Sequence, residues 1–464
     1  MLGVAAVAAI VLLADTCAGQ STASRRHAGP SKPAIYIYDL PQSFQNGTRV
    51  RSLELYDWWG YGSEKRIPEM LELAGHRTLD AETADYFLVP AWIYGISHQP
   101  YIRELEYEDM EYPPPELLAI RAVLDYIRDK WPHWDAKGGK DHIWTMSADH
   151  GFCGLSMAGP TPGMISSSVI LTQWGLMNFE THCEVEDRIM NFGDCGDRKL
   201  IKQMAAKGQV RLDRLPCFNP YKDIAVPSPA WDHDESAGPR REMQEEDEVY
   251  TEDGRLVMDV MSDVKNHTLF FVGGARWDTP DYSHGVRQTL FRLFNDTPGF
   301  RLVEKKGGDN PLSHKAMMRE MGRSHFCLAP AGDGYETRLK LAVNVGCIPL
   351  VIQDEIQVAF EDVLPYKDFA IRLGQHMLYR LPEILGDLLS QKREHADKPM
   401  LVEAMRRRLS CASQFLNWHA EGRAVEALAC SLLKRLHGDA VRPEMNWDRC
   451  QLHCEVPPTK TSPV

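Results

Sequence analysis

The chain has 464 residues, of which 44% are apolar and 25% are charged, a composition typical of globular proteins. Its 52 lysines and arginines against 65 aspartates and glutamates give a formal net charge of −13. This composition excludes collagen and intrinsic disorder, and the acidic balance argues against binding nucleic acid through phosphate neutralisation. At roughly 100 to 200 residues per domain, the length predicts about two to four domains.

The N-terminus has the pattern of a secretory signal. Residues 2–14 form an apolar run that small residues follow, so we expect a signal peptide or a short signal anchor over 1–19. The run is short for a membrane span, and no Lys or Arg precedes it, so cleavage and retention as an anchor both stay open. Asn46 and Asn266 begin glycosylation sequons, which the secretory pathway would make accessible to modification.

Cysteine counting supports the same compartment. The chain has 11 cysteines, and removal of Cys17 with the signal would leave an even number for disulfides. No CxxC pair occurs, so Cys450 and Cys454, in the Cys/Pro-containing tail 441–464, are interpreted as a local disulfide rather than a zinc site. Cys327 and Cys347 lie in apolar runs, where small buried core residues are the default.

The first part of the chain, residues 33–230, alternates strand and helix signals. Runs rich in β-branched and aromatic residues predict strands at 35–38, 86–89, 142–146 and 169–172. Residues 116–130 have apolar side chains at helical spacing, with Leu117, Val123 and Ile127 near one face. This alternation favours a parallel sheet covered by helices.

A second alternating set predicts another α/β domain over 263–440. Strands are expected at 269–272, 326–329, 347–352 and 369–372, and helices at 286–294, 313–322, 337–345 and 399–418. An acidic linker or loop, residues 231–262, separates the two sets. Within it, Asp232-His233-Asp234 resembles the DxD metal signature of sugar transferases. We reject that interpretation, because the sequence follows two prolines in the most charged part of the chain instead of ending a buried strand.

The densest functional signal runs from Ser324 to Leu373. It predicts a strand, a turn containing Gly332, Asp333 and Gly334, a helix entered near Arg338, and a second strand interrupted by Pro349. A glycine-rich turn before a helix exposes backbone N–H groups, which suits a diphosphate. An arginine on the first helical turn adds a fork of donors. For this motif alone, the simpler interpretation is favoured, namely a tight connection and a surface arginine.

A second candidate for phosphate binding ends another β-rich run. Phe270 to Val272 is followed by Gly273, Gly274 and Arg276, and Arg287 follows on a predicted helix. Open α/β sheets bind ligands at the C-terminal ends of their strands. A single arginine is most often a solvated surface residue, but two glycine turns with arginines in one domain favour an anion site.

The segment from Phe326 to Leu350, with FCLAPAGDG, RL and GCIPL, resembles the strongest block of the exostosin-like family of glycosyltransferases. Further matches occur in the family's order: IYIYDLP at 35–41, ADYFLVP at 84–90, DHIWTMSADHG at 141–151, LTQWG at 171–175, KDIAVPSP at 222–229 and FFVGGAR at 270–276. Together they cover roughly residues 33–373, and their number makes the resemblance specific.

The resemblance implies an α/β fold of the GT-B type, in which two Rossmann-like domains face a cleft. It also implies an inverting glycosyltransferase in the Golgi, with a glycan or glycoprotein acceptor on the N-terminal domain and a UDP-sugar on the C-terminal one. The departing UDP needs no obligatory metal in this fold, so we expect no metal and no cofactor beyond the donor substrate. A hetero-oligomer with another glycosyltransferase stays open, and no nucleic-acid partner is expected.

Roles follow from what inversion requires. The expected donor-binding residues are Gly273, Arg276, Gly332, Asp333, Gly334, Glu336 and Arg338: the arginines and backbone amides hold the diphosphate, and Asp333 and Glu336 contact ribose or sugar hydroxyls. We assign Asp149, which follows the strand at 142–146, as the base for the acceptor hydroxyl, with His150 as second choice and a plain turn as the alternative. A metal site made of His142, His150 and Asp149 is a poorer interpretation, because nothing fixes their spacing on one face.

One position departs from the family pattern. Many members have an acidic residue three positions after the motif arginine, where it can hold the donor ribose, and this chain has Leu341 there. Either Glu336 or Asp354 takes over that contact, or donor binding is altered or lost. The competing hypothesis is therefore a catalytically silent member that stabilises a partner transferase, and a secreted polysaccharide-binding protein is a third. Donor sugar, acceptor and linkage are not encoded in these motifs.

Overall fold

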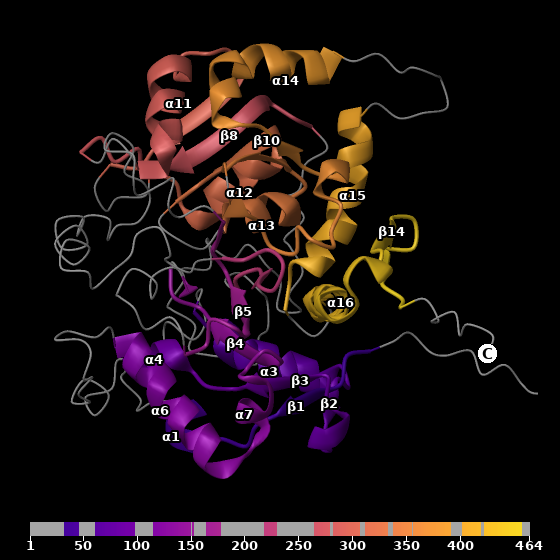
Figure 1. Cartoon of the computed structure of the whole chain (residues 1–464). Coiled ribbons are helices and arrows are strands. Elements are labelled where there is room, and N and C mark those ends of the chain that lie inside the picture. The colour runs from indigo at the N-terminus through magenta and orange to yellow at the C-terminus, as the bar shows by residue number, and fades with distance from the viewer. Residues whose placement is uncertain are drawn as a thin grey trace, which may run out of the picture.

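The computed structural model describes residues 32–45, 61–97, 115–149, 151–152, 164–177, 218–229, 264–278, 282–306, 311–332, 337–354, 356–390, 401–418 and 422–456. The two larger β-sheets and their helices lie one above the other (Figure 1). The predicted signal segment 1–19, the Asn46 sequon and the acidic linker 231–262 with its DxD-like sequence lie outside the described residues, so the domain bounds stay predictions. No helix in the described ranges is long and apolar enough to cross a membrane.

The N-terminal sheet has six parallel strands in the order β2-β1-β3-β4-β5-β7. They are β1 (Ile35–Ile37), β2 (Arg77–Thr78), β3 (Tyr86–Val89), β4 (His142–Met146), β5 (Val169–Thr172) and β7 (Ile224–Ala225). Every residue of β3, β4 and β5 is buried. Strands buried on both faces give continuous apolar runs, and the sequence predicts these three with the bounds that the structure shows.

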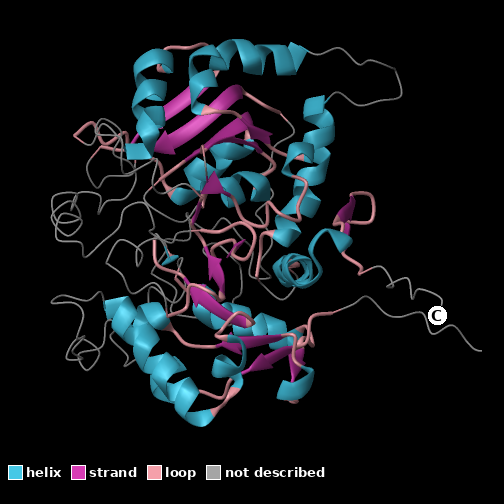
Figure 2. Ribbon diagram, viewed as in Figure 1, coloured by secondary structure: helices cyan, strands magenta, loops and turns pink. Residues whose placement is uncertain are grey.

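Helices surround this sheet (Figure 2). They are α1 (Gln42–Gln45), α3 (Ser63–Leu73), the 3₁₀ helix η1 (Ala81–Thr83), α4 (Ile93–Ser97), α6 (Pro115–Lys130) and α7 (His133–Lys137). As its spacing predicts, α6 buries Leu117, Val123 and Ile127. The sequence does not predict α3, because Pro68 lies inside it; the helix nevertheless buries Ile67 and neighbouring residues.

The C-terminal sheet has five parallel strands in the order β13-β11-β10-β8-β9. They are β8 (His267–Gly273), β9 (Phe300–Glu304), β10 (Ser324–Pro330), β11 (Ile348–Ile352) and β13 (Ile371–Arg372). The helical elements in this half are η6 (Tyr282–Gly285), α11 (Val286–Phe294), α12 (His314–Gly322), α13 (Arg338–Asn344), η7 (Tyr366–Asp368), η8 (Gln375–Arg380) and α14 (Leu381–Ser390). The expectation that Pro349 interrupts its strand is wrong, because β11 continues through it opposite Cys327.

Two short strands join the sheets. β6 (Gly175–Leu176) follows β5, β12 (Ile356–Gln357) follows β11, and the two pair antiparallel. A Cβ on Gly175 would lie 2.2 Å from the carbonyl oxygen of Gln357, so this approach requires glycine. Because β6 and β12 extend from the C-terminal ends of β5 and β11, the C-terminal edges of both sheets meet at one seam.

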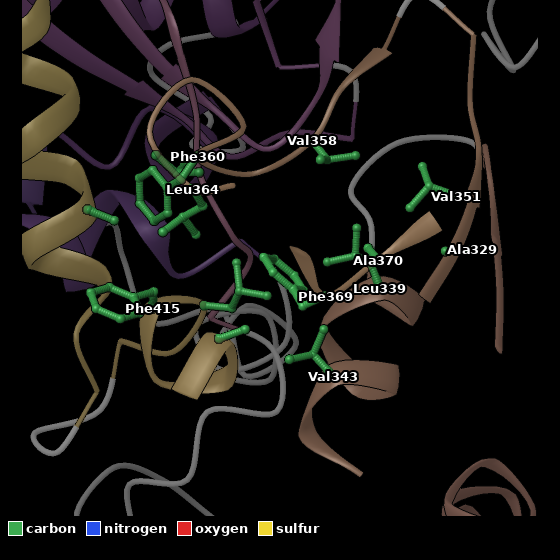
Figure 3. Packing of buried hydrophobic residues seen from close by; sticks show 14 of the residues in the cluster. Ala329, Leu339, Val343, Val351, Val358, Phe360, Leu364, Phe369, Ala370 and Phe415 are labelled. Atoms are coloured by element: carbon green, nitrogen blue, oxygen red, sulfur yellow. The ribbon is translucent and has the colours of Figure 1, made fainter. Parts of the chain in front are cut away.

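The last helices close the seam from one side. They are α15 (Leu401–Phe415), α16 (Ala424–His437) and the 3₁₀ helix η9 (Gly438–Ala440). Phe415 packs with Phe360 and other residues of one apolar cluster that reaches from the N-terminal sheet to these helices (Figure 3). Fully buried Trp418 donates a hydrogen bond from Nε1 to the carbonyl oxygen of Pro227 at 2.7 Å, and Arg66 of α3 donates to the carbonyl of Trp418 at 3.2 Å.

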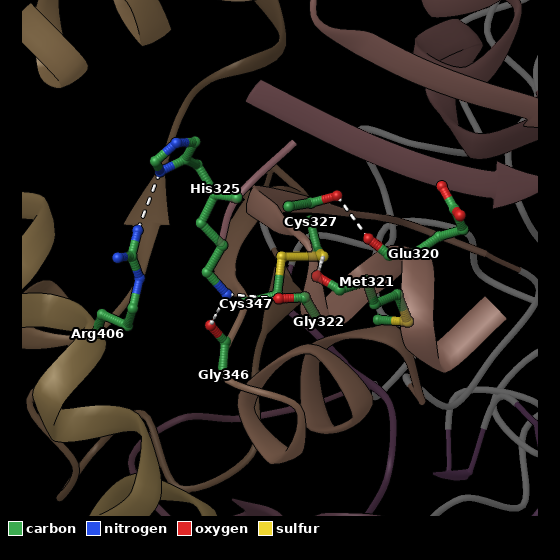
Figure 4. The surroundings of a disulfide bond; sticks show 10 residues. Glu320, Met321, Gly322, His325, Cys327, Gly346, Cys347 and Arg406 are labelled. Carbon is green, nitrogen blue, oxygen red and sulfur yellow. Dashed lines mark hydrogen bonds between the residues drawn. A yellow bond between two sulfur atoms is a disulfide. The ribbon is translucent and has the colours of Figure 1, made fainter. Parts of the chain in front are cut away.

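Disulfides correct two sequence-based expectations. Cys327 and Cys347 are buried, as expected, but they are bonded to each other beside the β10–β11 pairing (Figure 4). Cys450 bonds Cys411 of α15 and Cys454 bonds Cys430 of α16, which ties the hairpin of β14 (Glu444–Asn446) and β15 (Gln451–His453) to both helices. The expected Cys450–Cys454 disulfide is wrong, because β15 separates the two cysteines by about 13 Å of extended chain, beyond disulfide reach.

Candidate functional site

The order of strands in the C-terminal sheet marks the candidate site. β8 comes first in the chain and lies between β9 and β10: the chain passes from β8 to β9 on one side and then crosses to β10 on the other side of β8. Open α/β sheets bind ligands at such a switch point, beyond the C-terminal ends of the strands. The two predicted anion-binding turns follow β8 and β10, so the topology brings them to the same place.

Arg338, the first residue of α13, lies against the end of β8. Its Nε donates a hydrogen bond to the carbonyl oxygen of Val272 at 3.1 Å, and its guanidinium lies 5.4 Å from the ring centre of Phe271. A Cβ on Gly273 would come within 3.0 Å of Nη2 of Arg338. The glycine therefore leaves the space that the guanidinium occupies, and these two predicted donor-site residues lie side by side.

Arg287, on α11, connects the turn after β8 to the turn after β10. The side chain is only 3% exposed, and its two terminal nitrogens donate to the hydroxyl of Tyr282 at 2.6 Å and to the carbonyl of Ala331 at 3.0 Å. A Cβ on Gly332 would lie 3.2 Å from one of those nitrogens. Arg287 thus fixes the backbone at the start of the predicted Gly332 turn.

Two further cations complete a group. Arg276 adopts a positive φ of 51°, unusual for a non-glycine residue and frequent at functional sites, and its guanidinium lies 4.3 Å from the ring centre of Tyr282, which Arg287 also contacts. Lys305, directly after β9, donates its backbone N–H to the carbonyl oxygen of Gly273 at 3.1 Å, and burial together with the charge of Arg338 lowers the pKa of its ammonium group. We call Arg276, Arg287, Lys305 and Arg338 the cation cluster.

The sequence does not single out Lys305, because nothing in its local pattern links β9 to the turns after β8 and β10. The same is true of Trp277, a residue 48% exposed that follows Arg276 in the chain. Its Nε1 donates to a carboxylate oxygen of Glu304 at 2.5 Å, which fixes the indole at the end of β9. A fixed, exposed indole next to an anion site offers a stacking surface to a base or a sugar ring.

Several donor-site predictions lie outside the described residues, namely Asp333, Gly334 and Glu336. Leu341, in the position where family members have an acid, is 4% exposed and belongs to an apolar cluster with Phe270 and Val272. Asp354, one suggested replacement for that acid, accepts hydrogen bonds from the backbone N–H of Gln375 at 3.1 and 3.2 Å. Asp354 therefore holds the start of η8.

On the N-terminal side, Asp149 follows β4 and is exposed at the C-terminal edge of its sheet. The hydroxyl of Tyr61 donates to Oδ1 of Asp149 at 2.6 Å, and the ring of Tyr61 is stacked on that of Tyr94 with centres 4.4 Å apart. This arrangement fixes one carboxylate oxygen and leaves Oδ2 for a second donor, such as a substrate hydroxyl. His150, the second choice for the base, lies outside the described residues.

A buried carboxyl group lies behind Asp149. Glu64, at the start of α3, is 3% exposed and accepts hydrogen bonds from the backbone and hydroxyl of Ser147 and from the backbone of Tyr94. Burial raises the pKa of Glu64 to about 8, against the opposite effect of these three hydrogen bonds. The sequence gives no signal for Glu64, because its partners come from two distant segments.

His142 has a structural role in the N-terminal core. Nε2 is 2.7 Å from the hydroxyl of Tyr38, and Nδ1 is 2.9 Å from a carboxylate oxygen of Asp141. The side chain is fully buried, and burial lowers its pKa. With both ring nitrogens engaged, His142 is not available to bind a metal with Asp149.

The chain forms two α/β domains, each with a parallel sheet, and the C-terminal strand ends of the two sheets meet. Together with the cations at the switch point of one sheet, this architecture is of the GT-B type. The exostosin GT47 domain family matches residues 30–388. The chain therefore belongs to the exostosin GT47 family of glycosyltransferases, as the sequence motifs predict.

Curated relatives agree with this assignment. The chain is 23% identical over 401 residues to a probable glucuronosyltransferase of Oryza sativa subsp. japonica, covering 83% of this chain and 80% of that protein. It is 22% identical over 407 residues to a probable glucuronoxylan glucuronosyltransferase of Arabidopsis thaliana, with coverages of 83% and 71%. It is 23% identical over 376 residues to a probable beta-1,4-xylosyltransferase of Arabidopsis thaliana, with coverages of 80% and 76%.

Among solved structures, the GtfA/B complex resembles the chain only weakly, with a TM-score of 0.30 and 10% identity over 69% of this chain and 60% of that chain. A likeness of this size carries no argument about function.

Proposed function

We propose that this protein is an inverting glycosyltransferase that moves a sugar from a UDP-sugar to a glycan or glycoprotein acceptor. The observation that carries the proposal is the cation cluster at the switch point of the C-terminal sheet. Its three arginines are linked pairwise: Arg276 and Arg287 share the ring of Tyr282, and Arg287 and Arg338 share the ring of Phe271. Gathering like charges is unfavourable unless an anion binds among them.

On the donor side, the cluster would stabilise the negative charge that develops on the departing diphosphate. Fixed donors directed at developing charge are worth several kcal/mol of activation free energy in a site that excludes water. Four cationic side chains can balance a diphosphate by themselves, which is why we propose transfer without a metal. Trp277 would supply a stacking surface next to that diphosphate.

On the acceptor side, Asp149 would remove the proton from the acceptor hydroxyl. Its Oδ1 is held by Tyr61, so Oδ2 has a defined direction for that hydroxyl. Attack on the side of the sugar opposite UDP then gives inversion. The names of the relatives make UDP-glucuronic acid and UDP-xylose the first donors to test.

The secretory pathway, and the Golgi in particular, is the location that we propose. Three disulfides join cysteines within the described residues, and structural disulfides persist in oxidising compartments. The apolar N-terminal segment supports the same route.

The proposal is tested by calorimetric titration of UDP, followed by transfer assays with a panel of UDP-sugars. We expect Arg338→Ala to weaken UDP binding at least about tenfold, because it removes a charged donor to the diphosphate. Arg301→Ala is the matched control, since Arg301 is exposed on β9 and pairs with Glu320. Transfer should persist in EDTA, and an α-linked donor should give a β-linked product; no UDP binding at millimolar concentration would reject the enzyme hypothesis.

The second candidate function is a catalytically silent partner of another glycosyltransferase. Leu341 favours it, because its buried, apolar side chain cannot contact a ribose hydroxyl by hydrogen bonding. This candidate predicts no turnover with any UDP-sugar and co-purification with an active transferase. Transfer of sugar by the isolated protein would exclude it.

A further inference from the structure

Glu64 lies at the C-terminal ends of the neighbouring strands β3 and β4 and binds the segments that follow them. It lies in the first turn of α3, and its three hydrogen-bond donors are neutral. Oε1 accepts from the backbone N–H and the hydroxyl of Ser147, both at 2.9 Å, just after β4. Oε2 accepts from the backbone N–H of Tyr94 at 3.0 Å, in α4, which follows β3. One carboxyl group therefore holds two segments that start from adjacent strands.

Both segments influence the position of Asp149. Ser147 precedes it by two residues, so the first contact fixes the backbone from which Asp149 extends. The second contact fixes Tyr94, whose ring is stacked on Tyr61, and Tyr61 donates its hydroxyl to Asp149 at 2.6 Å. Glu64 thus influences the Asp149 carboxylate in two ways: through the backbone that carries Asp149, and through Tyr61, which donates a hydrogen bond to Asp149.

We propose that Glu64 is a positioning residue that holds the Asp149 carboxylate and its Tyr61 partner in the geometry required for sugar transfer. The inference rests on the proposed function and extends it to a residue that contacts no substrate. A buried carboxyl group with only neutral donors is costly to maintain. The contacts to Ser147 and Tyr94 explain why a carboxyl group is present.

The amide variant tests this arrangement, because both oxygens of a carboxyl group accept hydrogen bonds whether or not the group is protonated, whereas an amide nitrogen accepts none. In Glu64→Gln the single amide oxygen can still accept from Ser147, but the NH₂ group then faces the N–H of Tyr94, and two donors oppose each other. The Tyr94–Tyr61 stack should shift, and with it the hydroxyl that holds Asp149. The change in volume is small, so the rest of the core is retained.

With wild-type protein as reference, we expect E64Q to lower kcat about 10- to 100-fold while KM for the UDP-sugar and UDP affinity change less than about twofold. Asp223→Asn is the matched control. Asp223 is also a buried carboxylate in this domain and accepts from the backbone N–H groups of Ile170 and Asn219 and from the side chain of Lys222. It directly precedes the edge strand β7, whereas Asp149 follows the C-terminal end of β4. D223N should lower stability and leave kcat of the folded protein unchanged.

A double-variant cycle separates positioning from general damage. A residue that acts through Asp149 has little left to contribute once Asp149 is removed, so adding E64Q to Asp149→Asn should lower the residual rate less than about twofold. An unchanged kcat in E64Q, or an equal loss in both backgrounds, would overturn the inference.

Failure of the proposed function is distinguishable from failure of this inference. If wild-type protein transfers no sugar from any donor, the proposed function fails, and crystal structures of wild-type and E64Q protein decide the role of Glu64. Displacement of the Tyr61 hydroxyl from Asp149 in E64Q supports the positioning role. An unmoved Tyr61–Asp149 pair rejects it.

Discussion

The guanidinium of Arg338 donates a hydrogen bond to the carbonyl oxygen of Val272 at 3.1 Å, which fixes it beside the last residue of β8. That last residue, Gly273, leaves the necessary space. A Cβ there would lie 3.0 Å from Nη2 of Arg338 and 2.8 Å from the ring of Phe271. The position of the cation in the candidate donor site therefore depends on the absence of a side chain one residue after its acceptor.

Gly273→Ala should therefore weaken UDP binding without removing any charge. The added methyl group displaces the guanidinium, and loss of one charged hydrogen bond of about 1.5 to 3 kcal/mol corresponds to an affinity about 10- to 100-fold lower. Calorimetric titration with UDP measures the change directly. Gly386→Ala is the control, because nothing lies within 4 Å of the position of its Cβ on α14; an equal loss in both variants would contradict the assignment.

The stability of the protein should depend on pH through Glu64. Burial raises the pKa of this group from 4.5 to about 8, so between these values the folded chain holds a proton that the unfolded chain releases. The free energy of unfolding then decreases as pH rises from about 5 to about 8, by up to about 1.4 kcal/mol per pH unit. Urea denaturation across this range should show E64Q gaining stability relative to wild type as pH rises.

The control for that experiment is Glu72→Gln, on the exposed part of the same helix, where Glu72 pairs with Arg77 at 2.6 Å. Its stability curve should run parallel to that of wild type. Parallel curves for E64Q and wild type would show that Glu64 takes up no proton on folding.

The sequence predicts the sheets well because their strands are buried. β3, β4 and β5 read as short apolar runs, and α11 has the predicted bounds, Val286–Phe294. β9 is not predicted, because this edge strand is only partly buried and its residues do not form an apolar run. The cysteine pairings could not be predicted, since they depend on where the hairpin lies against α15 and α16.

The candidate site was predictable where chemistry is local in sequence. Gly273, Arg276 and Arg338 belong to two glycine turns with arginines, and the presence of both turns in one domain favours an anion site. Lys305 and Glu64 gain their significance only from folding, because Lys305 reaches the cation cluster from an adjacent strand and Glu64 joins segments that start from two strands. Local motifs predict candidate ligand contacts, whereas residues that position those contacts are recognised only in the folded structure.

Trp418 connects the two domains, and its replacement by Phe should destabilise the whole protein. The indole is fully buried, and its Nε1 donates to the carbonyl oxygen of Pro227 at 2.7 Å. Trp418→Phe leaves that buried carbonyl without its indole donor and creates a small cavity, so we expect a loss of about 2 to 4 kcal/mol in urea denaturation. Trp277→Phe, at a 48% exposed position, should cost far less, and similar losses in the two variants would argue against this role for Trp418.

The hairpin of β14 and β15 should depend on its two disulfides for order. An isolated two-stranded hairpin is marginally stable, and the bonds from Cys450 to α15 and from Cys454 to α16 attach it to the folded protein. The double variant Cys450→Ser/Cys454→Ser should therefore be cleaved by trypsin at Arg442 or Arg449 and leave a stable remainder with unchanged UDP affinity, as read by mass spectrometry and calorimetry. The double variant Cys327→Ser/Cys347→Ser is the control, because it removes a disulfide that lies beside the β10–β11 pairing instead of in the hairpin. At temperatures below the unfolding transition of this control variant, its hairpin should stay protected from trypsin. Equal resistance of the hairpin in the Cys450/Cys454 variant and in wild type would show that contacts such as the hydrogen bond from Trp447 to Asp368 at 3.0 Å are sufficient to hold it.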